Sequence, residues 1–134
     1  MHCLSKPACL AVAASAGLAL SALAQARMPE MQQAGALHYR CGGIGEDEST
    51  AMRAAMKDYP LSLLFAQRDG AYLANVAVEV GSGEGISCFT ANGPICLIQL
   101  PAGSYRITAT TREGASQTQA AEIGKTPHQL DFRY

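Results

Sequence analysis

The spacing of apolar residues changes along the chain. Residues 8–23 are almost continuously apolar and are broken only by small residues. Residues 49–59 repeat apolar side chains at intervals of three and four, as an amphipathic helix does, and Pro60 ends that pattern. From Leu61 onward, apolar and other residues alternate with a period of two. These patterns predict, in order, an apolar leader, one short helix and a series of β-strands.

Seven strands are predicted after the helix. The alternation is clearest in Val76–Val80 and Tyr105–Ala109, and turn residues lie between the segments, as in Asn92-Gly93-Pro94. Short strands separated by turns about every 8–12 residues are typical of an antiparallel sandwich. We therefore expect a mainly β protein, an antiparallel seven-stranded Ig-like or prealbumin-like sandwich preceded by one short α-helix.

The leader has the order of features found in secretory signal peptides. Lys6 gives it a basic start, the apolar run follows, and small residues close it at Ala22-Leu23-Ala24-Gln25-Ala26. The run is shorter than the roughly 20 strongly apolar residues that a membrane span needs. We predict that residues 1–26 are a signal peptide, cleaved after Ala24 or after Ala26. The protein is then periplasmic or secreted, with no membrane span after signal cleavage.

The remaining chain divides into three segments by composition. Residues 27–40 are polar without a sustained period and are expected to be a flexible linker, with a short strand near its end. Residues 41–60 contain a Gly-rich turn and the predicted helix, and residues 61–134 are expected to form the β-sandwich domain.

Charge narrows the possible partners. The chain has 10 basic and 11 acidic residues, and the leader contributes only Lys6 to that set. So small an imbalance gives no electrostatic reason to expect nucleic acid or an anionic membrane surface as a partner. We predict no nucleic-acid partner, and an unknown protein or envelope component remains the expected partner.

The cysteines indicate a disulfide without fixing its pairing. Cys3 and Cys9 leave with the leader, so Cys41, Cys88 and Cys96 remain, and an oxidising compartment permits a bridge. Because Cys88 and Cys96 flank a predicted turn, a hairpin would bring them close, and we take them as the first disulfide candidate. A bridge that uses Cys41, or three small buried thiols, are the alternatives.

The acidic and glycine-rich residues before the helix do not predict a ligand site. Gly42-Gly43-Ile44-Gly45 lacks the Lys-Ser/Thr that completes a phosphate-binding loop, and Glu46-Asp47-Glu48 would repel a phosphate there. Successive acids also do not alternate as calcium ligands do. We expect a flexible helix entry in which Asp47 or a neighbour caps the helix.

Other side chains with metal or catalytic chemistry are poorly arranged in the sequence. His38 and His128 are not spaced for zinc, and no local signature makes Cys41 a nucleophile. Met52 and Met56 lie one helical turn apart, so core packing accounts for them better than Cu(I) binding does. We predict no catalytic residues, no metal and no cofactor.

One stretch resembles a known family. Leu100-Pro-Ala-Gly-Ser-Tyr-Arg-Ile-Thr-Ala109 resembles the L-P-A-G-x-Y-x-[VI]-x-A stretch of carboxypeptidase regulatory-like domains, which are prealbumin-like sandwiches. In such a stretch Pro101 and Gly103 would form a tight corner, while Tyr105 buries its ring and its hydroxyl reaches backbone. Residues 42–48, the predicted helix and residues 72–76 resemble a narrower group, small uncharacterised proteobacterial secreted proteins with a GGIGxDE segment.

The resemblance implies a fold and leaves the activity open, because such sandwiches carry many unrelated functions. We expect a non-catalytic secreted or periplasmic module that mediates protein or envelope interaction. The alternative is a carrier that binds a small ligand or a carbohydrate, and an enzyme is the third hypothesis. The sequence leaves open whether the helix packs on its own sandwich or on a partner.

Overall fold

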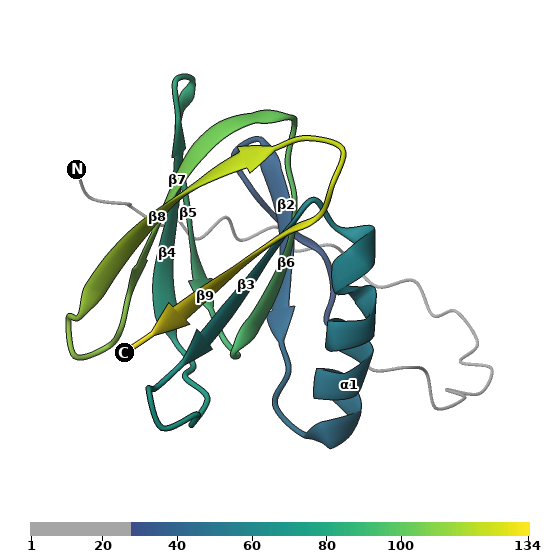
Figure 1. The fold of residues 1–134 in the computed structure, drawn as a ribbon, viewed down its shortest axis with the longest axis vertical. Helices are drawn as coiled ribbons and strands as arrows, with labels where there is room; N and C mark the ends of the chain where they lie inside the picture. Colours follow the sequence, from purple (N-terminus) through teal and green to yellow (C-terminus); the bar gives the residue numbers. More distant parts are fainter. Residues whose placement is uncertain (1–27) are drawn as a thin grey trace, which may run out of the picture.

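Two β-sheets face each other, and one helix lies outside them (Figure 1). The computed structural model describes residues 28–134, so the predicted signal peptide and its cleavage sites lie outside the described residues. The elements are β1 (Gln32–Ala34), β2 (Leu37–Gly42), α1 (Glu46–Ala55), the 3-10 turn η1 (Met56–Asp58), β3 (Leu61–Ala66), β4 (Val76–Ser82), β5 (Gly85–Ala91), β6 (Ile95–Gln99), β7 (Gly103–Thr110), β8 (Ser116–Ile123) and β9 (His128–Arg133).

The strands form a five-stranded sheet in the order β1-β2-β6-β3-β9 and a four-stranded sheet in the order β5-β4-β7-β8. Neighbouring strands are antiparallel except β3 and β9, which run parallel. The mainly β sandwich with one helix is therefore confirmed, and the seven predicted strands follow the helix as β3 to β9.

The structure differs from the expected linker at residues 27–40. β1 and β2 form an antiparallel hairpin that begins at Gln32, and β2 pairs along β6. Leu37 is buried in the core, and the ring of Tyr39 stacks on Phe89 of the opposite sheet at 4.1 Å between centroids. In β2 only Leu37, Tyr39 and Cys41 alternate toward the core. So short an alternation did not distinguish this strand from the polar residues around it in the sequence.

The protein has three layers because the central strands of the five-stranded sheet are buried on both faces. All six residues of β3 are buried, and so are Ile95–Ile98 of β6. Leu63 and Cys96 belong to the core between the sheets, whereas Leu64 and Ile95 belong to a second cluster under the helix. Covered faces on both sides explain why these strands are almost continuously apolar.

The helix packs on its own sandwich through Met52, which is completely buried against β6 and β3. It begins earlier than predicted, at Glu46, and its final turn tightens into η1. The helix N-cap is Gly45, and no side chain caps it. Asp47 therefore does not cap the helix, and its neighbour Glu48 instead accepts a hydrogen bond from the backbone N–H of Gly43 at 2.7 Å.

The polar strand β8 closes one side of the sandwich. Gln117 and Gln119 point toward β9, the edge strand of the other sheet, and their side-chain amides donate to the carbonyls of Arg133 and Asp131. The hydroxyl of Tyr134 adds a third link by donating to the Ala109 carbonyl at 2.6 Å. Hydrogen bonding therefore takes the place of apolar packing where β8 meets β9.

A disulfide joins Cys41 to Cys96, which are register partners on β2 and β6 with Cα atoms 4.1 Å apart. The predicted Cys88–Cys96 bridge is wrong, because the Cys96 sulfur is bonded to Cys41. The reason is topological: β5 and β6 flank a turn but belong to different sheets, so they do not form a hairpin. The alternative that used Cys41 is the one found.

The disulfide should contribute substantially to stability. It closes a loop with a sequence separation of 55 residues, and chain entropy for such a loop predicts a loss of about 4 kcal/mol on removal. We expect this loss in guanidinium unfolding of the Cys41→Ser/Cys96→Ser variant relative to the oxidised protein. A loss well below this size would show that the pairing of β2 with β6 holds the two strands together without the bridge.

Ser62 tests whether the face of β3 that the helix covers is as dry and apolar as its burial indicates. Its side chain is 1% exposed, and its hydroxyl has no hydrogen-bond partner. Ser62→Ala should leave the free energy of unfolding unchanged or raise it by up to about 1 kcal/mol, because a buried unpaired hydroxyl is unfavourable. Leu64→Ala on the same face is the control and should cost about 2–5 kcal/mol. A clear loss for Ser62→Ala would show that the hydroxyl is hydrogen-bonded in solution.

Candidate functional site

The residues of the family-like stretch lie at one end of the sandwich, in the connection from β6 to β7. The hydroxyl of Tyr105 donates to the Pro101 carbonyl at 2.7 Å, the kind of backbone contact expected from the sequence. Burial raises the pKa of Tyr105, and the negative charge of Glu84 raises it further. These residues stabilise a corner, and their polar groups are already used within it.

A hollow of about 440 Å³ lies beside this corner. We call it the Tyr105 hollow; turns from both sheets line it, at residues 35–37, 82–87 and 100–105. Ile86, which is 51% exposed, lies on its rim. The hollow offers one half-buried aromatic ring and one acid, Glu84.

A second hollow of about 560 Å³ lies among the connections at the other end of the strands. We call it the Ile44 recess; it is lined by residues 43–46, Ser49, residues 72–74 and Pro94. Ile44 is 65% exposed and Tyr72 is 54% exposed, so two of the three most exposed large apolar side chains in the described chain meet here.

The glycines before the helix form one wall of the recess and hold Ile44 outward. Gly42 touches the β5–β6 turn so closely that a Cβ on Gly93 would lie 2.6 Å from the Gly42 Cα atom. Gly43 and Gly45 have φ values of 93° and 88°, a region that favours glycine. The Gly-rich segment therefore serves backbone packing and a sharp change of direction, and Ile44 lies between two residues of constrained conformation.

The opposite wall is the segment around Tyr72, which the helix holds in place. Arg53 donates a hydrogen bond to the Tyr72 hydroxyl at 2.5 Å, and its guanidinium carbon lies 5.6 Å from the centre of the ring. The backbone N–H of Leu73 donates to the Phe65 carbonyl at 3.2 Å. Both the ring and the backbone of this wall are therefore fixed.

The recess has an acidic side, where α1 begins. Glu46 lines the recess and is exposed, as is Asp47 beside it. Glu48 is bound to Gly43, and Arg53 is bound to Tyr72. The lining residues carry one formal charge, that of Glu46, and no cation among them balances it.

The other candidate side chains are not brought together as a reactive site. His38 and His128 are exposed on β2 and β9, with two strands between them in the sheet. The Cys41 sulfur is in the disulfide and does not act as a thiolate. Within residues 28–134, no group of three or more His, Cys, Asp or Glu side chains is placed to hold a metal ion.

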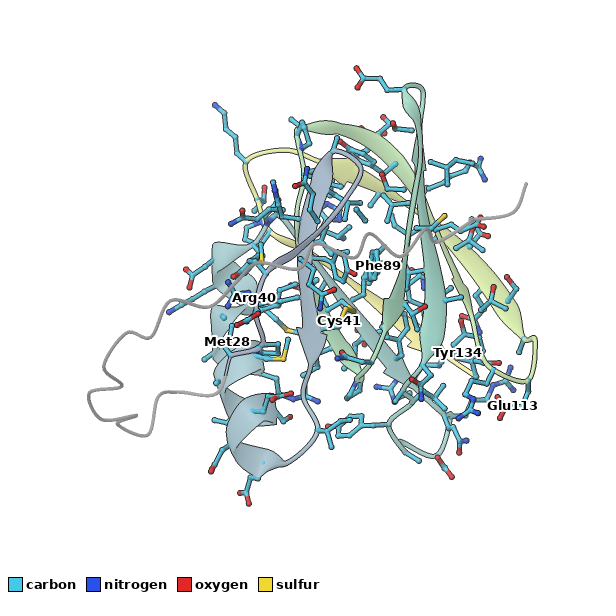
Figure 2. The ribbon with its side chains drawn as sticks, turned by 180° about the vertical axis from the view of Figure 1, so that it is seen from behind. Met28, Arg40, Cys41, Phe89, Glu113 and Tyr134 are labelled. Atoms are coloured by element: carbon cyan, nitrogen blue, oxygen red, sulfur yellow. A yellow bond between two sulfur atoms is a disulfide. The ribbon has the colours of Figure 1, made fainter. Side chains whose placement is uncertain are left out.

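Four of the five methionines gather between the helix and the sheet. Met52 is in the helix-side cluster, and Met28, Met31 and Met56 pack against it. Figure 2 shows Met28 and Arg40 beside the helix, with Cys41 and Phe89 farther into the sandwich. Arg40 donates a hydrogen bond to the Met31 sulfur at 3.1 Å, so a cationic group already uses that thioether. The arrangement favours core packing over Cu(I) binding.

Burial also affects two other tyrosines, both away from the recess. It raises the pKa of Tyr39, which stacks between the sheets, and of Tyr134, which spans them. Both hydroxyls donate hydrogen bonds, to the Gln32 side chain and to the Ala109 carbonyl. These tyrosines therefore act as neutral structural donors.

The recess was not predicted from the sequence, although the sequence contains a signal for it. Two of the segments that carry the narrower resemblance, 42–48 and 72–76, supply its opposite walls. Their proximity depends on the pairing of β2 and β3 with β6, which joins parts of the chain far apart in sequence.

Comparison of the sequence with protein-family models and with curated proteins finds no match. Among the helices of the described residues, none is both long and apolar enough to cross a membrane. The function must therefore be argued from the recess itself.

Gly93→Ala tests the contact that shapes the recess. The new methyl group would collide with Gly42 backbone atoms, which cannot rotate away as a side chain can. We expect a loss of roughly 1–3 kcal/mol in the free energy of unfolding. Gly124→Ala is the matched control, since nothing lies within 4 Å of its added Cβ, and it should change stability by no more than about 0.5 kcal/mol. Equal effects at both positions would show that the contact is not tight.

Proposed function

We propose that the protein is a non-catalytic, secreted or periplasmic β-sandwich module that binds another protein through the Ile44 recess. The observation that carries the proposal is the exposure of Ile44 and Tyr72 on opposite walls of one hollow. Single exposed apolar residues are ordinary, whereas a grouped apolar surface is typical of a binding site.

The contact between Arg53 and Tyr72 supports this function. Arg53 donates a hydrogen bond to the Tyr72 hydroxyl and holds the ring on its wall of the recess. A partner that packs on a side chain already held in place loses less binding free energy to ordering it.

The chemistry of the lining supports a binding role over a catalytic one. Its polar side chains are Glu46, Ser49 and Tyr72. Arg53 donates hydrogen bonds to the hydroxyls of both Ser49 and Tyr72. Neither hydroxyl is paired with a general base of the kind that activates a nucleophile.

The proposed compartment rests on two features. The leader has the order of a signal peptide. The Cys41–Cys96 bridge is of the kind that persists in oxidising compartments. Membership of the carboxypeptidase regulatory-like domains is also part of the proposal, and the sandwich fold supports it.

The Tyr105 hollow favours the second candidate function, a carrier that binds a small ligand or a carbohydrate. The half-buried Tyr105 ring and Glu84 could contact a sugar there. This candidate is weaker because the Tyr105 hydroxyl is already bound to Pro101 and the hollow has a single aromatic ring.

Site-specific photo-crosslinking tests which end of the sandwich binds a protein. With benzoylphenylalanine at position 44, we expect a discrete adduct in periplasmic extract, and excess unlabelled protein should suppress it. The Ile44→Ser protein should suppress it much less. Position 86, the exposed isoleucine of the other end, is the control and should give no such adduct. An adduct from position 86 alone would contradict the assignment of the recess.

A further inference from the structure

The chemistry of the recess specifies its occupant more closely than a general protein surface would. Its interior is apolar, with Ile44, Leu73 and Pro94 among the lining residues. Its helix side carries two exposed acids, Glu46 and Asp47. A complementary ligand therefore needs an apolar side chain and positive charge next to it.

We propose that the recess binds a peptide segment in which an apolar side chain is flanked by lysine or arginine. This inference rests on the proposed function and adds the chemistry of the partner. The apolar side chain packs between Ile44 and Tyr72, and the flanking cations face Glu46 and Asp47. Apolar contact supplies most of the affinity, and the charges supply selectivity.

The location of these acids in the first turn of α1 strengthens the preference for a basic ligand. The N-terminus of α1 carries a partial positive charge, and its first-turn acids Glu46, Asp47 and Glu48 more than offset that charge. Glu48 is used within the protein by Gly43, which leaves Glu46 and Asp47 to face solvent. The cation of Arg53 is already bound to the Ser49 and Tyr72 hydroxyls of the recess. The two acids at the start of the helix therefore favour a basic group of the ligand beside them.

Charge and shape disfavour two other occupants. An anionic lipid surface would meet the acids of the rim, and a flat bilayer does not match a concave hollow between loops. In a second copy of the chain, Ile86 and Arg106 both pair with Gly81 of β4 and so lie within a sheet. Residues held within a sheet enter a hollow between loops less readily than a free peptide does.

Three synthetic peptides of equal length test the proposal on the intact protein. The first has a central leucine–phenylalanine pair flanked by lysines, the second replaces the lysines with glutamates, and the third replaces the apolar pair with serines. Binding is followed by amide chemical shifts on isotope-labelled protein. We expect shifts at Ile44, Gly45 and Leu73, with affinity for the first peptide at least fivefold higher than for the other two. Added salt should reduce that preference.

Variants separate the two parts of the interaction. Glu46→Lys/Asp47→Lys should reverse the preference between the lysine and glutamate peptides, and Ile44→Ser should weaken both at least fivefold. Ile86→Ser is the matched control and should change nothing. All these side chains are exposed, and an unchanged melting temperature verifies that the variants fold.

Four outcomes would overturn the proposal. In the peptide titrations, these are equal binding of the basic and acidic peptides, or chemical shift changes confined to the Tyr105 hollow. The other two are binding to phosphatidylglycerol vesicles, or self-association in sedimentation, if Ile44→Ser abolishes it. The crosslinking result tests the proposed protein-binding function separately from the chemistry of the bound peptide. An adduct from position 44 without charge-dependent peptide binding refutes the partner chemistry and leaves the proposed function standing. Absence of both refutes both.

Discussion

The structure depends on the burial of β3 and β6 on both of their faces. A sandwich needs one buried face on each sheet, but these two strands are apolar on the second face as well, so that face must also be covered. The helix covers it through Met52, Met56 and the residues around Tyr59. The connection from β2 into that helix must then turn sharply around the end of the sheet. The recess forms where this connection meets the β5–β6 turn.

The same central pair explains why covalent and steric constraints concentrate in one region. Cys96 on β6 is bonded to Cys41 at the end of β2, and the next residue, Gly42, touches Gly93. The disulfide and the glycine contact therefore hold the end of β2 against β6 and the β5–β6 turn. The exposed Ile44 follows two residues after this fixed end of the strand.

Local patterns were sufficient to predict much of the fold. The alternation around Val76–Val80 and Tyr105–Ala109 placed β4 and β7, because each faces the core on one side only. Contacts between segments far apart in sequence were harder to predict. The bridge was assigned to Cys88 and Cys96 because they are near in sequence, whereas the chain crosses between sheets in the turn that separates them. The place of Ile44 beside Tyr72 could not be predicted either, because residues 43–46 and 72–74 are far apart in sequence and meet only in the folded chain.

The seam between β8 and β9 has a consequence for association in solution. Edge strands present unpaired backbone groups that can pair with another molecule and start aggregation. Here the amides of Gln117 and Gln119 occupy carbonyls of β9. The two glutamines therefore occupy two of the backbone carbonyls that this edge would otherwise present. A strand from another molecule would have to displace both side chains to pair with β9 at these positions.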